Sequence, residues 1–187
     1  TGYFRNLFSD KKIIIIKNAL NKANKVVAVS NFLKKKLISI GVKTKIKVIG
    51  NIVDDKIFFP IKKKQNNRLK LLIVCELVRK KNVHQLLYVL ERIFKKTKKF
   101  HLNIIGDGPE RKKLEKFVIK RNLKNNINFL GILDKSKIAQ FMQKSDFLLS
   151  VSKIETFGIT IAEAISCGLP CILINSGGPK DFIDSSN

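Results

Sequence analysis

Residues 155–170 read Glu-Thr-Phe-Gly-Ile-Thr-Ile-Ala-Glu-Ala-Ile-Ser-Cys-Gly-Leu-Pro, and our prediction of the fold starts from these sixteen residues. Glu155 and Glu163 stand eight residues apart in it, and Gly158 lies between them. The pattern predicts a helix over residues 158–167, opened by the glycine. Because the amino end of a helix carries partial positive charge, one acid on the preceding loop and another inside the helix can together grip a polar ligand there.

Between residues 25 and 175, short apolar runs rich in β-branched residues alternate with amphipathic stretches. This alternation is typical of βα units around a parallel sheet. The predicted strands are residues 26–29, 46–49, 69–74, 100–105, 127–130, 147–149 and 170–174. The predicted helices are residues 13–24, 31–40, 83–95, 110–121, a segment ending at residue 144, and 158–167. We therefore predict an α/β fold: a Rossmann-like parallel sheet with flanking helices.

Five residues mark helix ends in this pattern. Ser30 with Asn31 is suited to cap the helix that runs to residue 40, and Gly41 can close it. Asp134 is suited to cap the helix that runs to residue 144, because its carboxylate can accept from amides two or three positions on. Pro109 is placed where a proline is tolerated in a first helical turn.

A polar segment over residues 59–68 precedes the regular series of strands, and we interpret it as a linker. Residues 1–58 would then be the remnant of a preceding domain, and residues 69–187 the main domain. In the first part, the apolar run at residues 13–16 fits an amphipathic helix, a strand, or a segment resting on a membrane surface. Because the sheet predicted over residues 69–187 is incomplete at its carboxyl end, we expect a piece of a longer protein.

The composition narrows the choice of partners. The chain has 187 residues with 38 Lys and Arg against 14 acids, a formal charge of +24, which would attract nucleic acid, an anionic membrane or phosphorylated small molecules. The lysines form short groups along the chain, which favours a solvated surface. With no Trp and 13 Phe mostly at core spacing, we do not expect a nucleic-acid site.

The length of the apolar runs and the spacing of the cysteines indicate where in the cell we expect the protein. No run approaches the roughly eighteen apolar residues of a membrane span, and no cleavable leader opens the chain, so we expect a soluble or peripheral protein. The three cysteines, Cys75, Cys167 and Cys171, lack paired metal-ligand spacing. We expect them to be reduced thiols of a cytoplasmic protein, with no metal site.

Several stretches together resemble a known family. The Glu-x7-Glu segment followed by Cys-Gly-Leu-Pro resembles the signature of retaining glycosyltransferases of family 4, also called group 1, which have the GT-B architecture of two Rossmann-like domains. Further stretches are similar to family landmarks in order and spacing, and together they cover nearly the whole chain: Val29-Ser30-Asn31, Asn51-Ile52-Val53-Asp54 with Phe58-Phe59-Pro60, Gly106-Asp107-Gly108-Pro109-Glu110, Phe129-Leu130-Gly131 and Ser176-Gly177-Gly178-Pro179.

The resemblance implies roles for individual residues. Residues 1–58 match the end of an acceptor-binding domain and the crossover, and residues 69–187 match most of a nucleotide-sugar-binding domain. Glu155 is implied to contact the donor sugar as a catalytic residue and Glu163 to hold the ribose. The remaining implied contacts with the donor come from backbone near Phe157 and Gly158, from the turn at Gly106, and from Phe129 and Leu130 beside the base.

One landmark departs from the family pattern. Where the family has Gly-Arg-Leu and then a Lys, this chain has Cys75-Glu76-Leu77 and then Lys81. Lys81 fits the cation that stabilises the donor diphosphate, whereas Glu76 reverses the expected charge, so that Arg79 or Lys80 must compensate or the donor binds differently.

The resemblance implies transfer of a hexose, with retention, from a UDP-sugar or GDP-sugar to a hydroxyl of a glycan or lipid-linked glycan. It implies no cofactor besides this donor. We expect a cytoplasmic protein, peripheral at the inner or cytoplasmic face of a membrane, and a chain that is inactive without the rest of the acceptor domain. Two alternatives stay open: a non-catalytic basic module that binds anionic membrane or nucleic acid, and a degenerate GT-B domain.

Overall fold

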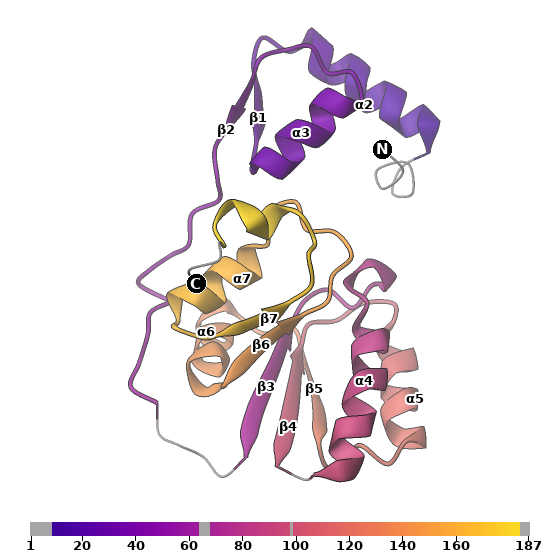
Figure 1. The fold of residues 1–187 in the computed structure, drawn as a ribbon, viewed down its shortest axis with the longest axis vertical. Helices are drawn as coiled ribbons and strands as arrows, with labels where there is room; N and C mark the ends of the chain where they lie inside the picture. Colours follow the sequence, from indigo (N-terminus) through magenta and orange to yellow (C-terminus); the bar gives the residue numbers. More distant parts are fainter. Residues whose placement is uncertain (1–8, 64–67, 98, 184–187) are drawn as a thin grey trace. The chain divides into compact units, whose positions relative to one another are not determined.

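A computed structural model describes residues 9–63, 68–97 and 99–183, and its chain forms two compact units (Figure 1). The larger unit comprises Val53–Ile154 and Ile159–Ser176. The smaller unit comprises the other described residues, which include the short segment Glu155–Gly158 between the two pieces of the larger one. Each unit is described by itself below.

The larger unit is built on a five-stranded sheet in the order β5-β4-β3-β6-β7, with every neighbouring pair parallel. Its strands are β3 (Leu69–Val74), β4 (Phe100–Ile105), β5 (Ile127–Gly131), β6 (Phe147–Ser150) and β7 (Cys171–Leu173). Its helices are α4 (Val83–Lys96), α5 (Arg111–Lys120), α6 (Lys135–Lys144) and α7 (Ile159–Ser166), with a 3-10 turn, η1, at Arg79–Lys81.

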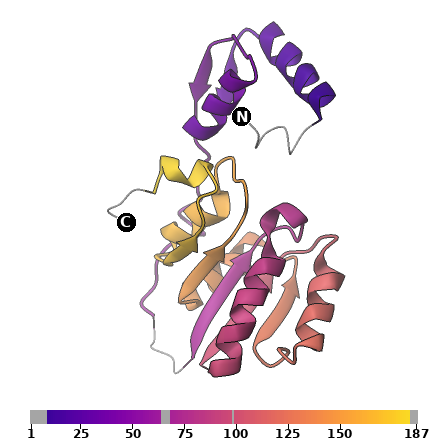
Figure 2. The same cartoon turned by 45° about the vertical axis from the view of Figure 1, so that its right-hand side comes forward.

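Helices cover both faces of this sheet. The chain adds β4 and β5 on one side of β3 and then returns to add β6 and β7 on the other, and right-handed crossovers therefore place α4 and α5 on one face and α6 and α7 on the opposite face (Figures 1 and 2). The central strand β3 is accordingly buried from Leu71 to Ile73, as a strand covered on both faces must be.

The core under α4 and α5 is made of aliphatic side chains from strands and helices. Leu71 and Ile73 of β3 pack with Leu87 of α4 and Leu114 of α5, and none of these exceeds 6% exposure. Glu91 is the charged exception in α4: it is buried, and it accepts from Lys95 at 2.6 Å and lies 3.6 Å from Arg121. Burial of the carboxylate is thus offset by two cations.

The smaller unit contains α2 (Asp10–Lys22), β1 (Val26–Ala28), α3 (Asn31–Ser39), β2 (Ile46–Val48) and the 3-10 turn η2 (Gly178–Asp181). β1 and β2 pair in parallel. Its core combines Val26 and Ala28 of β1 with Leu37 of α3, Val42 and Ile46. The strand interpretation of residues 13–16 is wrong, because this run lies inside α2, where Ile14 and Ile15 are exposed.

The elements follow the sequence pattern closely. β3 and β4 have the predicted bounds, and the other strands and helices differ by three residues or fewer at either end. Ser30 caps α3 by accepting from the Leu33 amide at 3.0 Å, and Asp134 caps α6 by accepting from the Lys137 amide at 2.9 Å. Pro109 corrects one prediction, because α5 begins at Arg111 and leaves the proline in the turn before the first helical residue.

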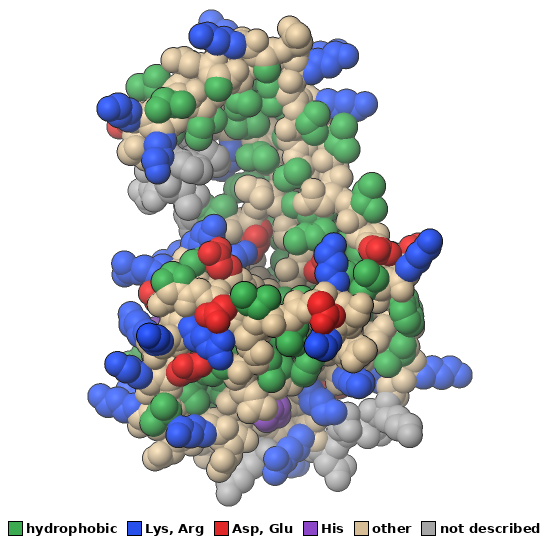
Figure 3. Space-filling model, turned by 180° about the vertical axis from the view of Figure 1, so that it is seen from behind, with side chains coloured by type: hydrophobic (Ala, Val, Ile, Leu, Met, Phe, Trp, Pro, Cys, Tyr) green, Lys and Arg blue, Asp and Glu red, His purple; other side chains and the backbone are tan. Residues whose placement is uncertain are grey.

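Charge is spread widely over the molecule. Lys and Arg side chains lie across the face shown in Figure 3, and acidic side chains on it are fewer. Among the described residues, no helix combines the length and the apolar character that crossing a bilayer requires. Between β2 and β3, the described residues 49–63 and 68 form no helix or strand, and the rest of the predicted linker lies outside the described residues.

Candidate functional site

The order of the strands identifies the edge of the sheet where a ligand site is expected. The chain reverses direction across the sheet between β3 and β6, and open α/β sheets bind ligands at the carboxyl ends of the strands at such a switch point. The loops that follow these two strands touch each other, because the Lys153 amide donates to the Lys80 carbonyl at 2.9 Å. The predicted residue Lys81 therefore lies at this edge.

Lys81 is the last residue of η1 and is half-buried, whereas Arg79 and Lys80 are exposed. Its amide donates to the Val78 carbonyl at 3.0 Å, and the next residue, Asn82, has φ 59°, a left-handed conformation that a short polar side chain tolerates. Lys81 is therefore less accessible to solvent than the two cations that precede it in the turn.

The loops after β3 and β4 are in close backbone contact. The Leu77 amide donates to the Asp107 carbonyl at 2.8 Å, and the Glu110 amide donates to the Leu77 carbonyl at 2.9 Å. Gly106 has φ 123°, and a Cβ there would lie 1.9 Å from the Cys75 carbonyl oxygen. Gly106 was predicted to contact a ligand; in the structure it allows these two loops to meet, and its contact with a ligand stays a prediction.

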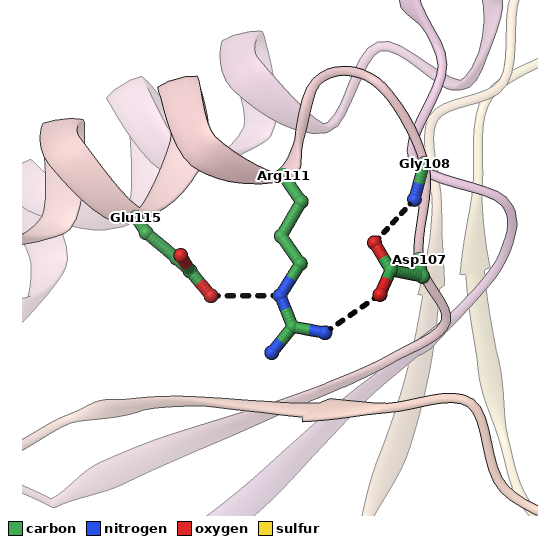
Figure 4. A network of polar contacts seen from close by, with 4 residues as sticks. All are labelled: Asp107, Gly108, Arg111 and Glu115. Atoms are coloured by element: carbon green, nitrogen blue, oxygen red, sulfur yellow. Dashed lines mark hydrogen bonds and ion pairs between the residues drawn. The ribbon is translucent and has the colours of Figure 1, made fainter.

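A polar network fixes the turn that leads from β4 into α5 (Figure 4). Asp107 accepts from the Gly108 amide at 2.7 Å and from Arg111 Nη1 at 2.9 Å, and Arg111 Nε donates to Glu115 at 2.8 Å. The amide of Gly108 and the Arg111 guanidinium lower the pKa of Asp107. Glu115 and Asp107 in turn raise the pKa of Arg111. The network therefore favours the charged forms of Asp107 and Arg111.

Phe129 and Leu130 lie on β5, an edge strand two positions from β3. Both line a cavity of about 420 Å³ between β5 and α5, which Val118 and Ile119 also line. Phe129 is half-buried against the main core. Both residues therefore lie on the β5 edge of the sheet. Their contact with a base stays a prediction.

Glu163 is the fifth residue of α7 and is half-buried. Burial raises its pKa, and the charge of Lys135 opposes that shift. No hydrogen bond or ion pair to another described residue holds its carboxylate. Burial raises the pKa of the Cys167 thiol, and the charge of Glu163 raises that pKa further. A partly desolvated acceptor without a protein partner is the kind of group found in binding sites.

The segment Glu155–Gly158 belongs to the smaller unit, where backbone contacts and one side-chain hydrogen bond hold it. The Gly178 amide donates to the Glu155 carbonyl at 2.9 Å, Glu155 forms a parallel bridge with Gly177, and Ser30 Oγ donates to the Thr156 carbonyl. A Cβ on Gly178 would lie 2.4 Å from the Thr156 carbonyl oxygen. Glycine is therefore required where these two segments meet.

Phe157 uses its side chain for packing within the smaller unit. Its ring lies 5.1 Å from the Phe182 ring at an angle of 40°, and a Cβ on Gly50 would lie 3.3 Å from it. The predicted ligand contact of this residue therefore concerns its backbone. Gly158 is buried with φ 89° and directly precedes α7. The two predicted glutamates fall in different units, so their binding of one ligand stays a prediction.

Comparison with known families shows to which protein family the chain belongs. The family model described as "Glycosyl transferases group 1" matches residues 53–187, and the model described as "Glycosyltransferase Family 4" matches residues 1–57. The chain belongs to the group 1 glycosyltransferases. An uncharacterized glycosyltransferase of Methanocaldococcus jannaschii, MJ1178, is 32% identical over 167 residues, which cover 89% of this chain and 44% of that protein.

Two further comparisons add a relative and a structure. The alpha-monoglucosyldiacylglycerol synthase of Acholeplasma laidlawii is 28% identical over 109 residues, 58% of this glycosyltransferase chain and 27% of the relative. The crystal structure of Anabaena Alr3699/HepE in complex with UDP and glucose superposes with a TM-score of 0.83 at 24% identity, covering 96% of this chain and 52% of that one. The predicted GT-B fold class is confirmed, and this glycosyltransferase chain spans about half the length of its relatives or less.

Two residues that support the Glu155 segment were not predicted as part of the site. Ser30 and Gly178 stood out in the sequence only as parts of short motifs, Val29-Ser30-Asn31 and Ser176-Gly177-Gly178-Pro179. In the structure of this glycosyltransferase both contact the backbone of residues 155–157. The signal was therefore present in the sequence as motifs, without the long-range contact that gives them a role.

Proposed function

We propose that the whole protein transfers a hexose from a nucleotide-diphosphate sugar, a UDP-sugar or a GDP-sugar, to an acceptor hydroxyl with retention of configuration. One observation carries this proposal: the group 1 model extends over residues 53–187 and includes Lys81, Glu155 and Glu163. The Anabaena relative by fold was crystallised with UDP and glucose, which supports a nucleotide-sugar donor here. Residues 1–58 would belong to the acceptor-binding domain, 59–68 to a linker and 69–187 to the donor-binding domain.

The proposal assigns a part of the donor to each predicted residue. Glu163 is assigned to the ribose, because an ionised carboxylate can accept from two adjacent hydroxyls and this one has no partner among the described residues. Lys81 and the amides at the start of α7 are assigned to the diphosphate. Glu155 is assigned to the transferred sugar, with the backbone at Phe157 and Gly158 beside it.

In the proposed mechanism, retention results from attack on the same face from which the leaving group departs. The acceptor oxygen forms a bond to the anomeric carbon as the bond from that carbon to the phosphate oxygen breaks, and the acceptor proton passes to the departing diphosphate. The protein contributes orientation and charge stabilisation rather than a nucleophile. Lys81 stabilises the negative charge that grows on the diphosphate, and no cofactor takes part in this scheme.

The acceptor is proposed to be a glycan or a lipid-linked glycan, used by a peripheral protein at the cytoplasmic face of a membrane. The name of the Acholeplasma laidlawii relative refers to a glycosylated diacylglycerol, a lipid. The surface of α5 fits an anionic bilayer, because Lys112, Lys116 and Lys120 are exposed on it together with Ile119, which is 52% exposed. If the protein does not co-sediment with phosphatidylglycerol vesicles at low salt, the proposed membrane association is contradicted. The proposed donor binding is not affected by that result.

The donor proposal is tested by thermal protection. UDP, GDP and their sugars should raise the melting temperature of the protein, and Lys81→Gln should reduce the effect strongly. Lys80→Gln is the matched control, because Lys80 is the adjacent residue and is exposed. Equal protection of both variants would remove Lys81 from the site. Unchanged melting with every nucleotide diphosphate and nucleotide sugar would refute donor binding, as expected of a degenerate domain.

A further inference from the structure

A cavity of about 210 Å³ lies in the larger unit where α4 and α5 begin, beside the loop that follows β3. Residues from five segments line it: the loop after β3, η1, the start of α4, the start of α5 and the loop after β6. Lys81, Gly106, Phe129, Leu130 and Glu163 are not among its lining residues. It is therefore separate from the residues assigned to the donor in the larger unit.

Three cations converge on this cavity from distant points of the sequence. Arg79 comes from η1, Lys113 from α5 and Lys153 from the loop after β6. In the part of the chain that the structure describes, none of the three forms an ion pair or a side-chain hydrogen bond. Because like charges repel one another, an arrangement of three unpaired cations around one hollow favours the binding of an anion.

The backbone adds positive potential at the same place. The helices α4 and α5 have 14 and 10 residues, and both begin at the cavity. Neither N-cap residue, Asn82 or Glu110, caps its helix through its side chain; the side-chain amide of Asn82 donates to Gln85 Oε1 at 2.8 Å instead. The amino ends of both helices therefore have amides that a ligand can use.

We propose that this cavity binds the phosphate group of a small phosphate ester. The three cations and the two helix ends would hold the phosphate. Glu110 also lines the cavity and is its single acid, and a carboxylate there accepts hydrogen bonds from hydroxyls. A hydroxylated ester such as glycerol 3-phosphate therefore fits better than inorganic phosphate, which has no alcohol hydroxyl to reach Glu110 while the cations hold its oxygens. The volume is sufficient for a ligand of headgroup size.

The test is a titration of the isotope-labelled chain with glycerol 3-phosphate, followed by amide NMR shifts. Saturable shifts are expected at Val83 and His84, in the first turn of α4, and at Lys113. Arg79→Gln and Lys153→Gln should each weaken binding at least tenfold. Lys120→Gln is the matched control, because Lys120 is exposed at the far end of α5 and does not line the cavity.

The outcomes separate the possibilities. Shifts spread over lysines across the surface, or equal affinity in all variants, would overturn the proposal, as would glycerol 3-phosphate and glycerol giving the same result. Glu163→Gln should bind glycerol 3-phosphate normally even where it loses nucleotide, so failure of the donor proposal leaves this one standing. Displacement of the ester by phosphatidylglycerol vesicles, but not by phosphatidylcholine vesicles, would assign the phosphate to a lipid headgroup; no displacement would assign it to a soluble ester.

Discussion

Glu163→Gln separates the stability of the fold from the binding of the donor. Glutamine keeps the shape of the side chain and removes its charge. In the folded chain burial raises the pKa of Glu163 above its ordinary value of 4.5, so the ionised carboxylate opposes folding at neutral pH. The unliganded variant should therefore melt at the same temperature as the parent chain or higher. This difference should shrink as the pH falls through the raised pKa of the folded state and below 4.5, where both side chains are neutral.

The loss of nucleotide binding can be given a magnitude. A ligand at 100 times its Kd stabilises the folded state by about 2.7 kcal/mol, which for a chain of this size is about 5–11 °C. A carboxylate that accepts from two ribose hydroxyls contributes charge-assisted bonds of about 1.5–3 kcal/mol each, of which the amide keeps part. A net loss of about 2 kcal/mol weakens binding about 30-fold and leaves about 0.9 kcal/mol of protection at the same nucleotide concentration.

The assay is differential scanning fluorimetry with an added dye, run with and without UDP and GDP at neutral and acidic pH. The expected result at neutral pH is a higher or equal melting point without nucleotide and a protection reduced to about a third. A variant that loses stability and keeps full protection would refute the assignment. It would show that Glu163 supports the fold and does not hold the nucleotide.

Three other substitutions test the structure around the site. Gly106→Ala should destabilise the chain by more than about 3 kcal/mol, because its Cβ would overlap a carbonyl oxygen, whereas Gly168→Ala, also at positive φ but with no neighbour closer than 3.3 Å, should cost about 1 kcal/mol in urea unfolding. Ser30→Ala should cost about 1–2 kcal/mol, because it removes the α3 cap and leaves the Thr156 carbonyl without its donor; an unchanged urea midpoint would contradict this. The Lys137 amide lowers the pKa of Asp134, so stability should fall as pH drops through that lowered pKa, and Asp134→Asn, which can still cap, should show less of this pH dependence in thermal melts.

The helices and strands could be predicted from the sequence because helix-capping residues and apolar runs agree with the alternation of strands and helices along the chain. β3 and β4 consist mainly of apolar residues, and β3 is buried over three consecutive residues, so their runs have clear ends. Ser30 and Asp134 each cap through a contact three residues away, which sequence spacing alone specifies. Local chemistry of this kind is readable before any fold is known.

Contacts between distant segments could not be read in the same way. Ser30 and Thr156 are 126 residues apart, and no periodicity indicates that one donates to the other. The 3-10 turn at Arg79–Lys81 follows from the left-handed Asn82 and from a backbone bond to Val78, neither of which three consecutive cations reveal. The short segment after β6 belongs to the smaller unit although its neighbours on both sides belong to the larger one.

Glu76 is negatively charged where the family has an arginine, and its exposure to solvent determines how strongly that charge acts on a ligand. Glu76 is exposed and Lys81 is half-buried. Two unit charges 4 Å apart interact by about 1 kcal/mol in water but by about 4 kcal/mol near a protein surface of lower effective dielectric constant. A diphosphate held beside Lys81 therefore gains more from that lysine than it loses to a solvated carboxylate. If the proposed diphosphate site lies at Lys81, the solvated carboxylate of Glu76 opposes it less than that lysine stabilises it, which supports the proposal of a donor site over a degenerate domain.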